Sequence, residues 1–204
     1  LRRLKGREQV KVICMDLSSP FRSIVQRLFP RAKIVADRFH VIRLIIDTFH
    51  EFCKAADPEI KWKRGIICAL RTKGANLRPT QRLLLEKEFS RHPAIETAYD
   101  FKEELCTLLS IKERKRINCI PLLERLKEMV WQMLHEAPEI FKKLGRTIRQ
   151  WFEPIIRMWR FTKSNGITEG FHRKMKLIQR RAYGYRNFQN YRLRVLMECG
   201  HIVI

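Results

Sequence analysis

The sequence predicts an α/β protein in which helices predominate, and two observations support this class. Near the start, two short runs of β-branched and apolar residues flank a helical pattern, which is typical of a strand–helix–strand unit. After residue 56 the strand signals vanish, and apolar residues recur at helical spacing. We therefore expect three parts: strand–helix–strand–helix over residues 1–56, an all-helical insertion over 57–160, and C-terminal helices over 161–204 that complete the core.

The first part contains two predicted strands, each of which ends at an aspartate. Residues 10–15 form an apolar run that stops at Asp16, and residues 32–36 form a second run that stops at Asp37. Between them, residues 18–20 (Ser-Ser-Pro) are typical of a helix start. A unit this short implies parallel strands, so both aspartates are expected at the same carboxyl edge. Open α/β sheets place their chemistry at that edge.

Helical periodicity predicts the remaining elements. A long helix opens near His40 and completes the first part. The insertion is expected to hold helices at residues 60–70, 80–89, 94–109, 121–135 and 139–151. The breaks between them are assigned to Gly74, Pro79, Pro93, Pro121 and Pro138. A turn at residues 164–166 precedes one helix from about residue 167 and another over 188–199.

The charge of the chain indicates a polyanionic partner. The 204 residues carry a formal net charge of +22, with a sequence pI near 10.4. Such an excess repels itself, so nucleic acid is the first candidate partner and a membrane surface the second. No apolar run approaches the roughly 20 residues that a membrane span needs. The six cysteines are scattered without a C-x-x-C pair, and most lie among apolar neighbours. We therefore expect buried free thiols and no zinc site.

Glu169 is the one acidic residue between Pro154 and Val195, where eleven Lys and Arg occur. A lone carboxylate adds little to solubility in such a segment, so it is better explained as a group that faces a cation or a reacting phosphate. Cations and aromatic residues alternate after it, which suits backbone tracking and base stacking. The predicted DNA-binding residues are Arg173, Lys174, Lys176, Arg180, Arg181, Tyr183, Tyr185 and Arg186.

Taken singly, the acidic candidates have ordinary explanations. Asp16 could be a turn residue, Asp37 a helix N-cap, His40 a packing group, and Glu169 an acid that complements a helix dipole. Together they suit divalent metal binding, because Mg²⁺ prefers carboxylate oxygens and leaves positions open for phosphate and water. Two such ions support phosphodiester chemistry by activating the nucleophile and stabilising the leaving oxygen.

Two blocks of sequence resemble the DDE transposases of bacterial insertion sequences, most closely the ISL-three-type group. One block runs from residue 12 to 40 and includes Asp37-Arg38-Phe39-His40. The other runs from residue 164 to 188 and includes Ser164-Asn165-Gly166-Ile167-Thr168-Glu169-Gly170. The resemblance covers essentially the whole chain. The helical middle matches the family in length and helical pattern more than in individual residues.

The resemblance implies a ribonuclease-H-like catalytic core interrupted by a helical insertion, with a two-metal Mg²⁺ site and cut-and-transfer chemistry on transposon ends. Asp16 then looks like the second acid of the catalytic triad and Glu169 like the third, both as metal ligands. Asp37 and His40 look like the accessory D-x-x-H motif. DNA is the implied partner, a homodimer is expected for the full-length protein, and the protein is expected in the bacterial cytoplasm.

Two departures from the family pattern bear on activity. The first catalytic Asp of the family lies on a strand upstream of anything in these residues, so we expect a truncated chain that is inactive alone. His172 stands where relatives usually carry Asn, and its role is unassigned. The alternative is a non-catalytic, basic DNA-binding remnant of a transposase, and a metal-dependent nuclease on the same core is a third reading.

Overall fold

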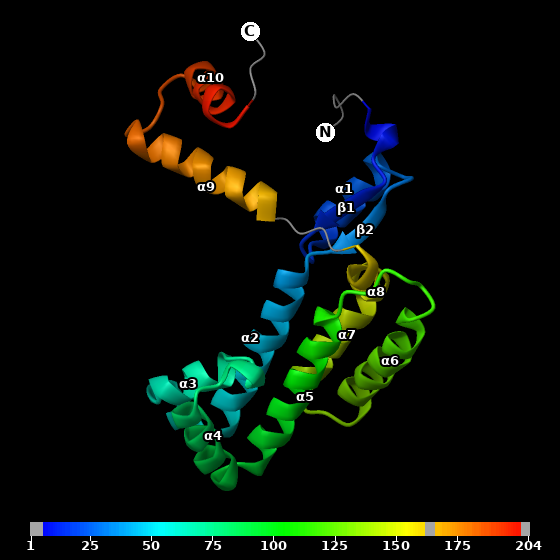
Figure 1. The fold of residues 1–204 in the computed structure, drawn as a ribbon, viewed down its shortest axis with the longest axis vertical. Coiled ribbons are helices and arrows are strands. Elements are labelled where there is room, and N and C mark those ends of the chain that lie inside the picture. The colour runs from blue at the N-terminus through cyan, green and yellow to red at the C-terminus, as the bar shows by residue number, and fades with distance from the viewer. Residues whose placement is uncertain (1–5, 162–165, 201–204) are drawn as a thin grey trace. The chain divides into compact units, whose positions relative to one another are not determined.

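The computed structural model describes residues 6–161 and 166–200, with the side chains of 166–169 left out. The chain forms two compact units, Leu1–Lys163 and Ser164–Ile204, and each is described by itself. Figure 1 shows the path of the chain and labels its elements. The sequence predicted three parts, with the C-terminal helices completing the core of the first part. The two compact units do not test that assignment, so it stays a prediction.

The first unit begins with the predicted strand–helix–strand motif. Strands β1 (Val12–Met15) and β2 (Lys33–Ala36) pair in parallel, with Val12 opposite Lys33 and Met15 opposite Ala36. Helix α1 (Ser19–Leu28) connects them, and Pro20 lies in its first turn. The parallel pairing is as predicted. Strand β1 starts two residues later than expected, after a short 3₁₀ helix over Arg7–Gln9.

Helix α8 packs against the small sheet, and helix α2 leads from the sheet into the helical part of the unit. Helix α2 (Arg38–Ala56) begins directly after β2, and Val41, Ile45 and Phe49 on one face are almost completely buried. Helix α8 (Phe152–Arg160) packs against β2, although it follows that strand by more than a hundred residues in the printed sequence. Strand β2 is therefore buried by a segment that belongs to the far end of the unit.

Only helices occur among the described residues between Asp57 and Arg160. Besides α8, they are α3 (Arg64–Arg71), α4 (Pro79–Arg91), α5 (Pro93–Ser110), α6 (Cys119–His135) and α7 (Glu139–Gln150), with 3₁₀ turns at Pro58–Trp62 and Gly74–Asn76. The sequence predicted that helix α6 starts at Pro121, but the helix starts two residues earlier, at Cys119. Pro121 lies in its first turn, where the missing N–H of proline is tolerated. Helix α8 was not predicted as a separate element.

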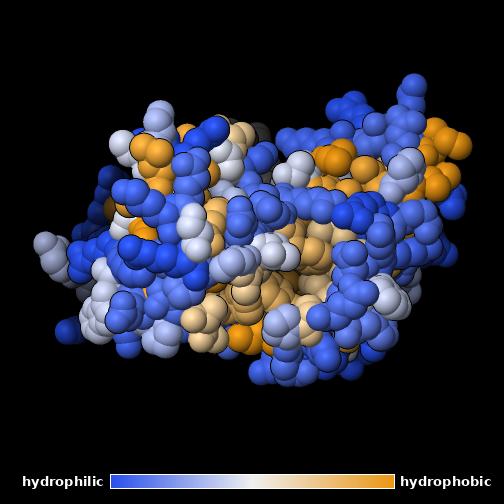
Figure 2. Space-filling model, turned by 90° about the horizontal axis from the view of Figure 1, so that it is seen from below, coloured by the Kyte–Doolittle hydropathy of each residue, from blue (hydrophilic) through white to orange (hydrophobic). Residues whose placement is uncertain are grey.

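One hydrophobic core runs through the first unit from the sheet to helix α7. Its largest buried side chains include Trp151 and Trp159. Helices α2, α5, α6 and α7 also line an apolar groove of about 500 Å³ on a face that is otherwise mostly hydrophilic (Figure 2). Among the described residues, no helix combines the length and the apolar character that crossing a bilayer would require.

Helices α6 and α7 approach each other at Gly145. A Cβ atom built on Gly145 would lie 3.0 Å from Cβ of Met133 and 3.3 Å from side-chain carbons of Leu134. Real side chains rarely come so close, so the absence of a side chain at this position sets the distance between the two helices.

The second unit is a helical hairpin. Helix α9 (Gly166–Arg181) is followed by a turn and by helix α10 (Phe188–Cys199). The turn contains Tyr183 at φ 51° and Gly184 at φ 98°. A left-handed conformation is routine for glycine but costs energy for tyrosine. The turn therefore holds an aromatic residue in a conformation that local propensity does not favour.

All six cysteines are free, as the sequence predicted. The expectation that they are buried holds only for Cys53, because Cys68 is exposed and the other four are half-buried.

Candidate metal centre and nucleic-acid interface

The ends of the two strands bring Asp16 and Asp37 together. Each follows the last residue of its strand, and those last residues, Met15 and Ala36, are paired in the sheet. The backbone N–H of Asp37 donates to the carbonyl of Met15 at 2.7 Å, which extends the ladder by one more bond. The two carboxylates therefore leave the same edge of the sheet, as the sequence predicted from the parallel arrangement.

His40 lies between the two carboxylates. Its Nδ1 is 3.1 Å from Oδ1 of Asp16 and 2.9 Å from Oδ2 of Asp37. One potential ligand atom from each of the three residues lies within 4.8 Å of the others, which is close enough for one cation to contact all three. The donor set of two carboxylates and one imidazole fits a divalent metal ion.

The three residues differ in exposure, and this separates their roles. Asp37 is 2% exposed, and its Oδ1 accepts a hydrogen bond from the N–H of Phe39, which makes it the N-cap of α2. The side chain of Asp16 is 52% exposed and that of His40 is 34% exposed. Asp37 is thus built into the helix start and orients His40, whereas Asp16 faces solvent. Asp37 is therefore both the N-cap of α2 and a member of the cluster with Asp16 and His40.

The local electrostatics favour a cation at this edge. Burial, followed by the negative charges of Asp37 and Asp16, raises the pKa of the Cys14 thiol to about 11. Cys14 therefore stays a neutral thiol, and the formal charge at the edge comes from the two aspartates.

Arg38 ties this edge of the sheet to the helices of the insertion. Its guanidinium donates to the carbonyls of Met158 at 2.6 Å, Ile111 at 3.2 Å and Ser110 at 3.4 Å. These carbonyls lie at the C-terminal ends of α8 and α5, where backbone acceptors lack helical partners. Burial lowers the pKa of Arg38, and a guanidinium stays charged in proteins. Arg38 therefore fixes the first turn of α2 to the ends of both α5 and α8.

Glu169 lies in helix α9 of the second unit. Its side chain is outside the described residues. Its pairing with Asp16 in one metal site stays a prediction. His172, three residues later on the same helix, is exposed.

The predicted DNA-binding residues are mostly exposed on the second unit. Every one of the eight is exposed except Tyr185, which is half-buried and packs against Tyr191 with ring centroids 5.3 Å apart. Tyr183 is fully exposed at the strained turn. Strained, exposed aromatic residues are common at binding sites, because function rather than packing keeps them there. The arrangement suits contact with the backbone and the bases of DNA.

A second acidic cluster lies in the insertion and was not predicted. Asp57, Glu88 and His92 place ligand atoms within 4.8 Å of one another. The ammonium of Lys63 lies between the carboxylates, at 3.0 Å from Asp57 and 3.2 Å from Glu88. A protein cation therefore already balances the charge that a metal ion would neutralise. We interpret this cluster as structural.

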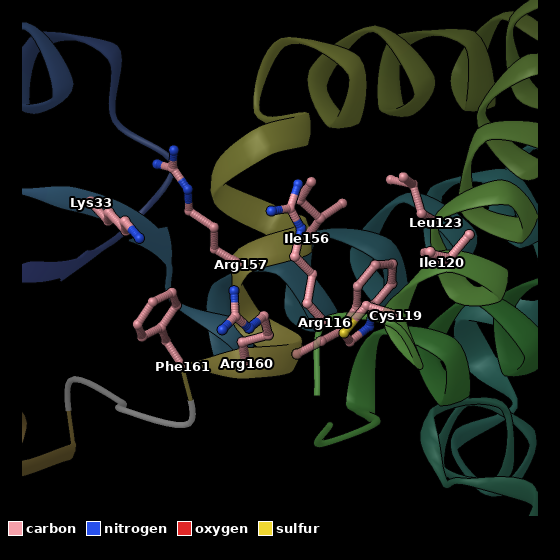
Figure 3. Close-up of a pocket in the computed structure, with 10 residues that line it drawn as sticks. Lys33, Arg116, Cys119, Ile120, Leu123, Ile156, Arg157, Arg160 and Phe161 are labelled. Carbon is pink, nitrogen blue, oxygen red and sulfur yellow. The ribbon is translucent and has the colours of Figure 1, made fainter. Parts of the chain in front are cut away.

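Sequence reasoning also missed a group of cations on the first unit. Lys33, Arg116, Arg157 and Arg160 line a groove between β2, α6 and α8 (Figure 3). The run Lys112-Glu113-Arg114-Lys115-Arg116 was a local signal for it. The other cations come from separate elements, so their proximity depends on the fold.

Comparison with known proteins identifies relatives of the whole chain. A sequence profile of transposases of the DDE, ISL3 type matches residues 1–195. The transposase for insertion sequence element IS1001 of Bordetella parapertussis is 24% identical, over 92% of this chain and 47% of its own length. A protein of Lactococcus lactis subsp. lactis named ATP-dependent protease is 25% identical, over 61% of this chain and 37% of its own length. No solved structure matches the chain significantly.

Proposed function

Because the chain belongs to the ISL3 family of DDE transposases, we propose that it forms the C-terminal part of a transposase catalytic domain that cleaves and joins DNA at insertion-sequence ends. The chain spans less than half the length of the two curated relatives it matches. The activity of a whole transposase is therefore part of this proposal. The observation that carries the proposal is the convergence of Asp16, Asp37 and His40 at one sheet edge.

In this proposal the small parallel sheet is half of a ribonuclease-H-like core, and the helices between Asp57 and Arg160 are the insertion. The parallel pairing of β1 and β2 supports this assignment, as does the position of both aspartates after their strands. Helix α9 would return to the core and bring Glu169 to the same edge.

Asp16 and Glu169 would hold the metal, and the other two residues would position Asp16. Asp16 is exposed enough to ligate an ion, while Asp37 fixes the imidazole of His40 at 2.9 Å. Bound Mg²⁺ would activate the attacking oxygen of water or of a DNA 3′-hydroxyl and stabilise the leaving oxygen of the phosphodiester. DDE transposases also need an upstream aspartate. We place that residue in the segment that precedes these residues in the full-length protein.

The second unit would bind the DNA backbone. The exposed cations of α9 supply contacts to phosphates, and Tyr183 supplies a surface for stacking. This binding does not depend on the metal, so it can be measured separately from catalysis.

Metal binding can be tested on the 204-residue chain by localised oxidation. Fe²⁺ in place of Mg²⁺ generates hydroxyl radicals with ascorbate and peroxide, and these radicals cut the backbone near the bound ion. We expect cuts around residues 16 and 37 that disappear in Asp16→Asn. The matched control is Asp47→Asn, because Asp47 is an exposed carboxylate of α2 outside the cluster. Cuts at these positions that persist in Asp16→Asn would refute the metal assignment.

Catalysis is tested with the upstream segment supplied, on one chain or in trans. We expect Mg²⁺-dependent cleavage and joining of insertion-sequence ends that Asp16→Ala and Glu169→Ala abolish while Asp47→Ala leaves it intact. DNA binding without cleavage, unaffected by these substitutions, would instead support a non-catalytic DNA-binding remnant. Cleavage without joining would favour a nuclease.

A further inference from the structure

The first unit carries a groove of about 420 Å³ between the start of β2, the N-terminal turn of α6, and α8 (Figure 3). Its volume is in the range of sites for small ligands, roughly 300–1,000 Å³. Its lining divides into cations and apolar residues, and no acidic residue contributes to it. The lining residues are Lys33, Arg116, Cys119, Ile120, Leu123, Ile156, Arg157, Trp159, Arg160 and Phe161.

The cations stand at the rim. Lys33, Arg116 and Arg160 are exposed. The guanidinium of Arg157 is held in place by the carbonyl of Ile34 at 3.1 Å and by an ion pair with Glu153. Across the described part of the chain, the side chains of Lys33 and Arg116 make no ion pair or hydrogen bond within the protein. The ammonium of Lys33 lies 5.9 Å from the centre of the Phe161 ring. Neither cation is neutralised by a carboxylate of the described residues, so an anion can pair with both.

The loop before α6 adds to this positive surface. The backbone N–H of Glu113 donates to the carbonyl of Trp159 at 2.9 Å, which anchors the loop to α8. The carboxylate of Glu113 accepts from the N–H of Lys115 at 2.8 Å, and this hydrogen bond lowers the pKa of Glu113. The one acid of the loop is thus engaged by the loop's own backbone. The cations around it are all exposed, namely Lys112, Arg114, Lys115 and Arg116.

The floor of the groove is apolar, and its hydrogen-bond donors are already used. Ile120 is 51% exposed although it is a large hydrophobic residue. The indole N–H of Trp159 donates to the carbonyl of Leu108 at 2.9 Å, and the thiol of Cys119 contacts the carbonyl of Lys115 at 3.5 Å. An occupant of the floor is therefore selected by its apolar surface and shape, because these two groups offer no further donor.

We propose that this groove binds one unpaired nucleotide of DNA, with the base on the apolar floor and the flanking phosphates on Lys33, Arg116 and Arg160. This inference rests on the proposed DNA function. An intact duplex presents phosphates and sugars at its surface and keeps the faces of its bases stacked, so it could use the rim but not the floor. An unstacked base offers the flat apolar face that the floor accepts.

Two consequences follow from the composition of the groove. Because the floor makes no hydrogen-bond demand, binding will tolerate any base at the unpaired position. The groove belongs to the same compact unit as Asp16 and Asp37, and the hydrogen bond from Arg157 to the carbonyl of Ile34 ties its lining to strand β2. DNA held in the groove is therefore held by the unit that carries the proposed metal site.

The test uses the 204-residue chain and two DNA duplexes of equal length, one fully paired and one with a single extrahelical 2-aminopurine. Fluorescence anisotropy gives the affinities, and 2-aminopurine emission reports the environment of the unpaired base. We expect the chain to bind the DNA with the unpaired base about tenfold more tightly, since one stacked base contributes roughly that factor. Ile120→Asp should abolish this preference, because it places a carboxylate on the floor.

Lys33→Ala with Arg116→Ala should weaken binding of both DNAs and lower the salt dependence by about one unit of slope for each lost contact. The matched controls are Leu83→Asp and Arg91→Ala, since Leu83 is a 58% exposed hydrophobic residue and Arg91 an exposed cation, both on α4. Both controls should keep the tenfold preference and the emission change.

Equal affinity for the two DNAs, or a preference that survives Ile120→Asp, would overturn the inference and leave the proposed function standing. Absence of any salt-dependent DNA binding by the wild-type chain would instead overturn the proposed function itself. Circular dichroism of each variant establishes that it is folded before its affinity is compared.

Discussion

Lys63 is the cation that balances two buried carboxylates, Asp57 and Glu88. Glu88 is 2% exposed and Asp57 is 7% exposed, so two carboxylates are buried close together. Burial alone would raise the pKa of Asp57, but the hydrogen bonds from Lys63 and from the N–H of Glu59 outweigh it and lower that pKa. The hydrogen bond to Asp57 raises the pKa of Lys63 in return.

The direction of these pKa shifts fixes the pH range of the stabilisation. A lowered pKa at Asp57 means that its contribution is present above the ordinary value of about 4 and is lost as the pH falls through that region. A raised pKa at Lys63 means that its contribution is present below about 10.5 and is lost only as the pH rises beyond that value. The cluster therefore stabilises the fold across the neutral range.

Lys63→Met should destabilise the first unit by about 2–3 kcal/mol at pH 7, because two buried carboxylates lose their partner. The side chain of Lys63 is 29% exposed, so the loss stays below the full cost of an unpaired buried charge. Urea unfolding followed by tryptophan fluorescence measures it, since all four tryptophans lie in this unit. The difference from wild type should shrink as the pH falls below about 4, because the stabilisation that comes from the lowered pKa of Asp57 is lost there.

Lys127→Met is the control, since Lys127 pairs with Glu124 at 2.9 Å on an exposed helix face. That substitution should cost less than about 1 kcal/mol. Equal losses from both substitutions at pH 7 would refute the role assigned to the buried cluster.

At the scale of elements, the contact between α6 and α7 depends on the missing side chain of Gly145. Gly145→Ala should improve the helix propensity of α7 by up to about 1 kcal/mol. The added methyl would also meet Met133 at 3.0 Å, and overpacking a core costs about 1–3 kcal/mol. We expect net destabilisation, measured as a lower midpoint of thermal unfolding by circular dichroism.

Gly170→Ala provides a control of opposite sign. Gly170 lies inside α9, and nothing lies within 4 Å of the position that a Cβ would take. Only the gain in propensity remains there, so this substitution should leave the midpoint unchanged or raise it. A Gly145→Ala protein as stable as wild type would show that the two helices can separate without loss.

The elements also show where sequence reasoning succeeds and where it stops. The two strands and α1 were predictable because β-branched runs, Pro20 and helical spacing agree locally. Helix α8 was missed because the last predicted helix of the insertion ended at residue 151, and only the fold shows that residues 152–160 pack against β2 as a helix. The proximity of Asp16 and Asp37 was predictable, because a short strand–helix–strand unit implies parallel strands whose carboxyl ends share one edge. His40 follows Asp37 by one helical turn. The Lys63 cluster joins residues up to 35 positions apart on separate elements, and no local pattern marks it.

At the scale of the whole molecule, the net charge of +22 should govern affinity for DNA. Each neutralised phosphate releases counterions, so the logarithm of the binding constant should fall steeply and linearly with the logarithm of the salt concentration. Arg180→Ala with Arg181→Ala should reduce that slope by about two units, one for each contact. Fluorescence anisotropy across a salt series measures it.

Arg91→Ala is the reference for this series as well, because Arg91 is exposed but belongs to neither the groove nor α9. Its slope should match that of the wild type. An equal fall in slope for all substituted cations would mean that the charge acts as a diffuse field rather than through an interface on α9.

Arg38 links the proposed metal position at the sheet edge to helix α8, which lines the groove. Asp37 and His40 face the proposed metal position, while Arg38 grips the ends of α5 and α8. A ligand that displaced α8 would therefore move the residues that orient Asp16. Thermodynamic linkage makes such an effect reciprocal: whatever factor DNA in the groove contributes to cation affinity, the cation must contribute to DNA affinity. The groove and the sheet edge would then respond to each other, whereas DNA binding by the second unit would not depend on the ion.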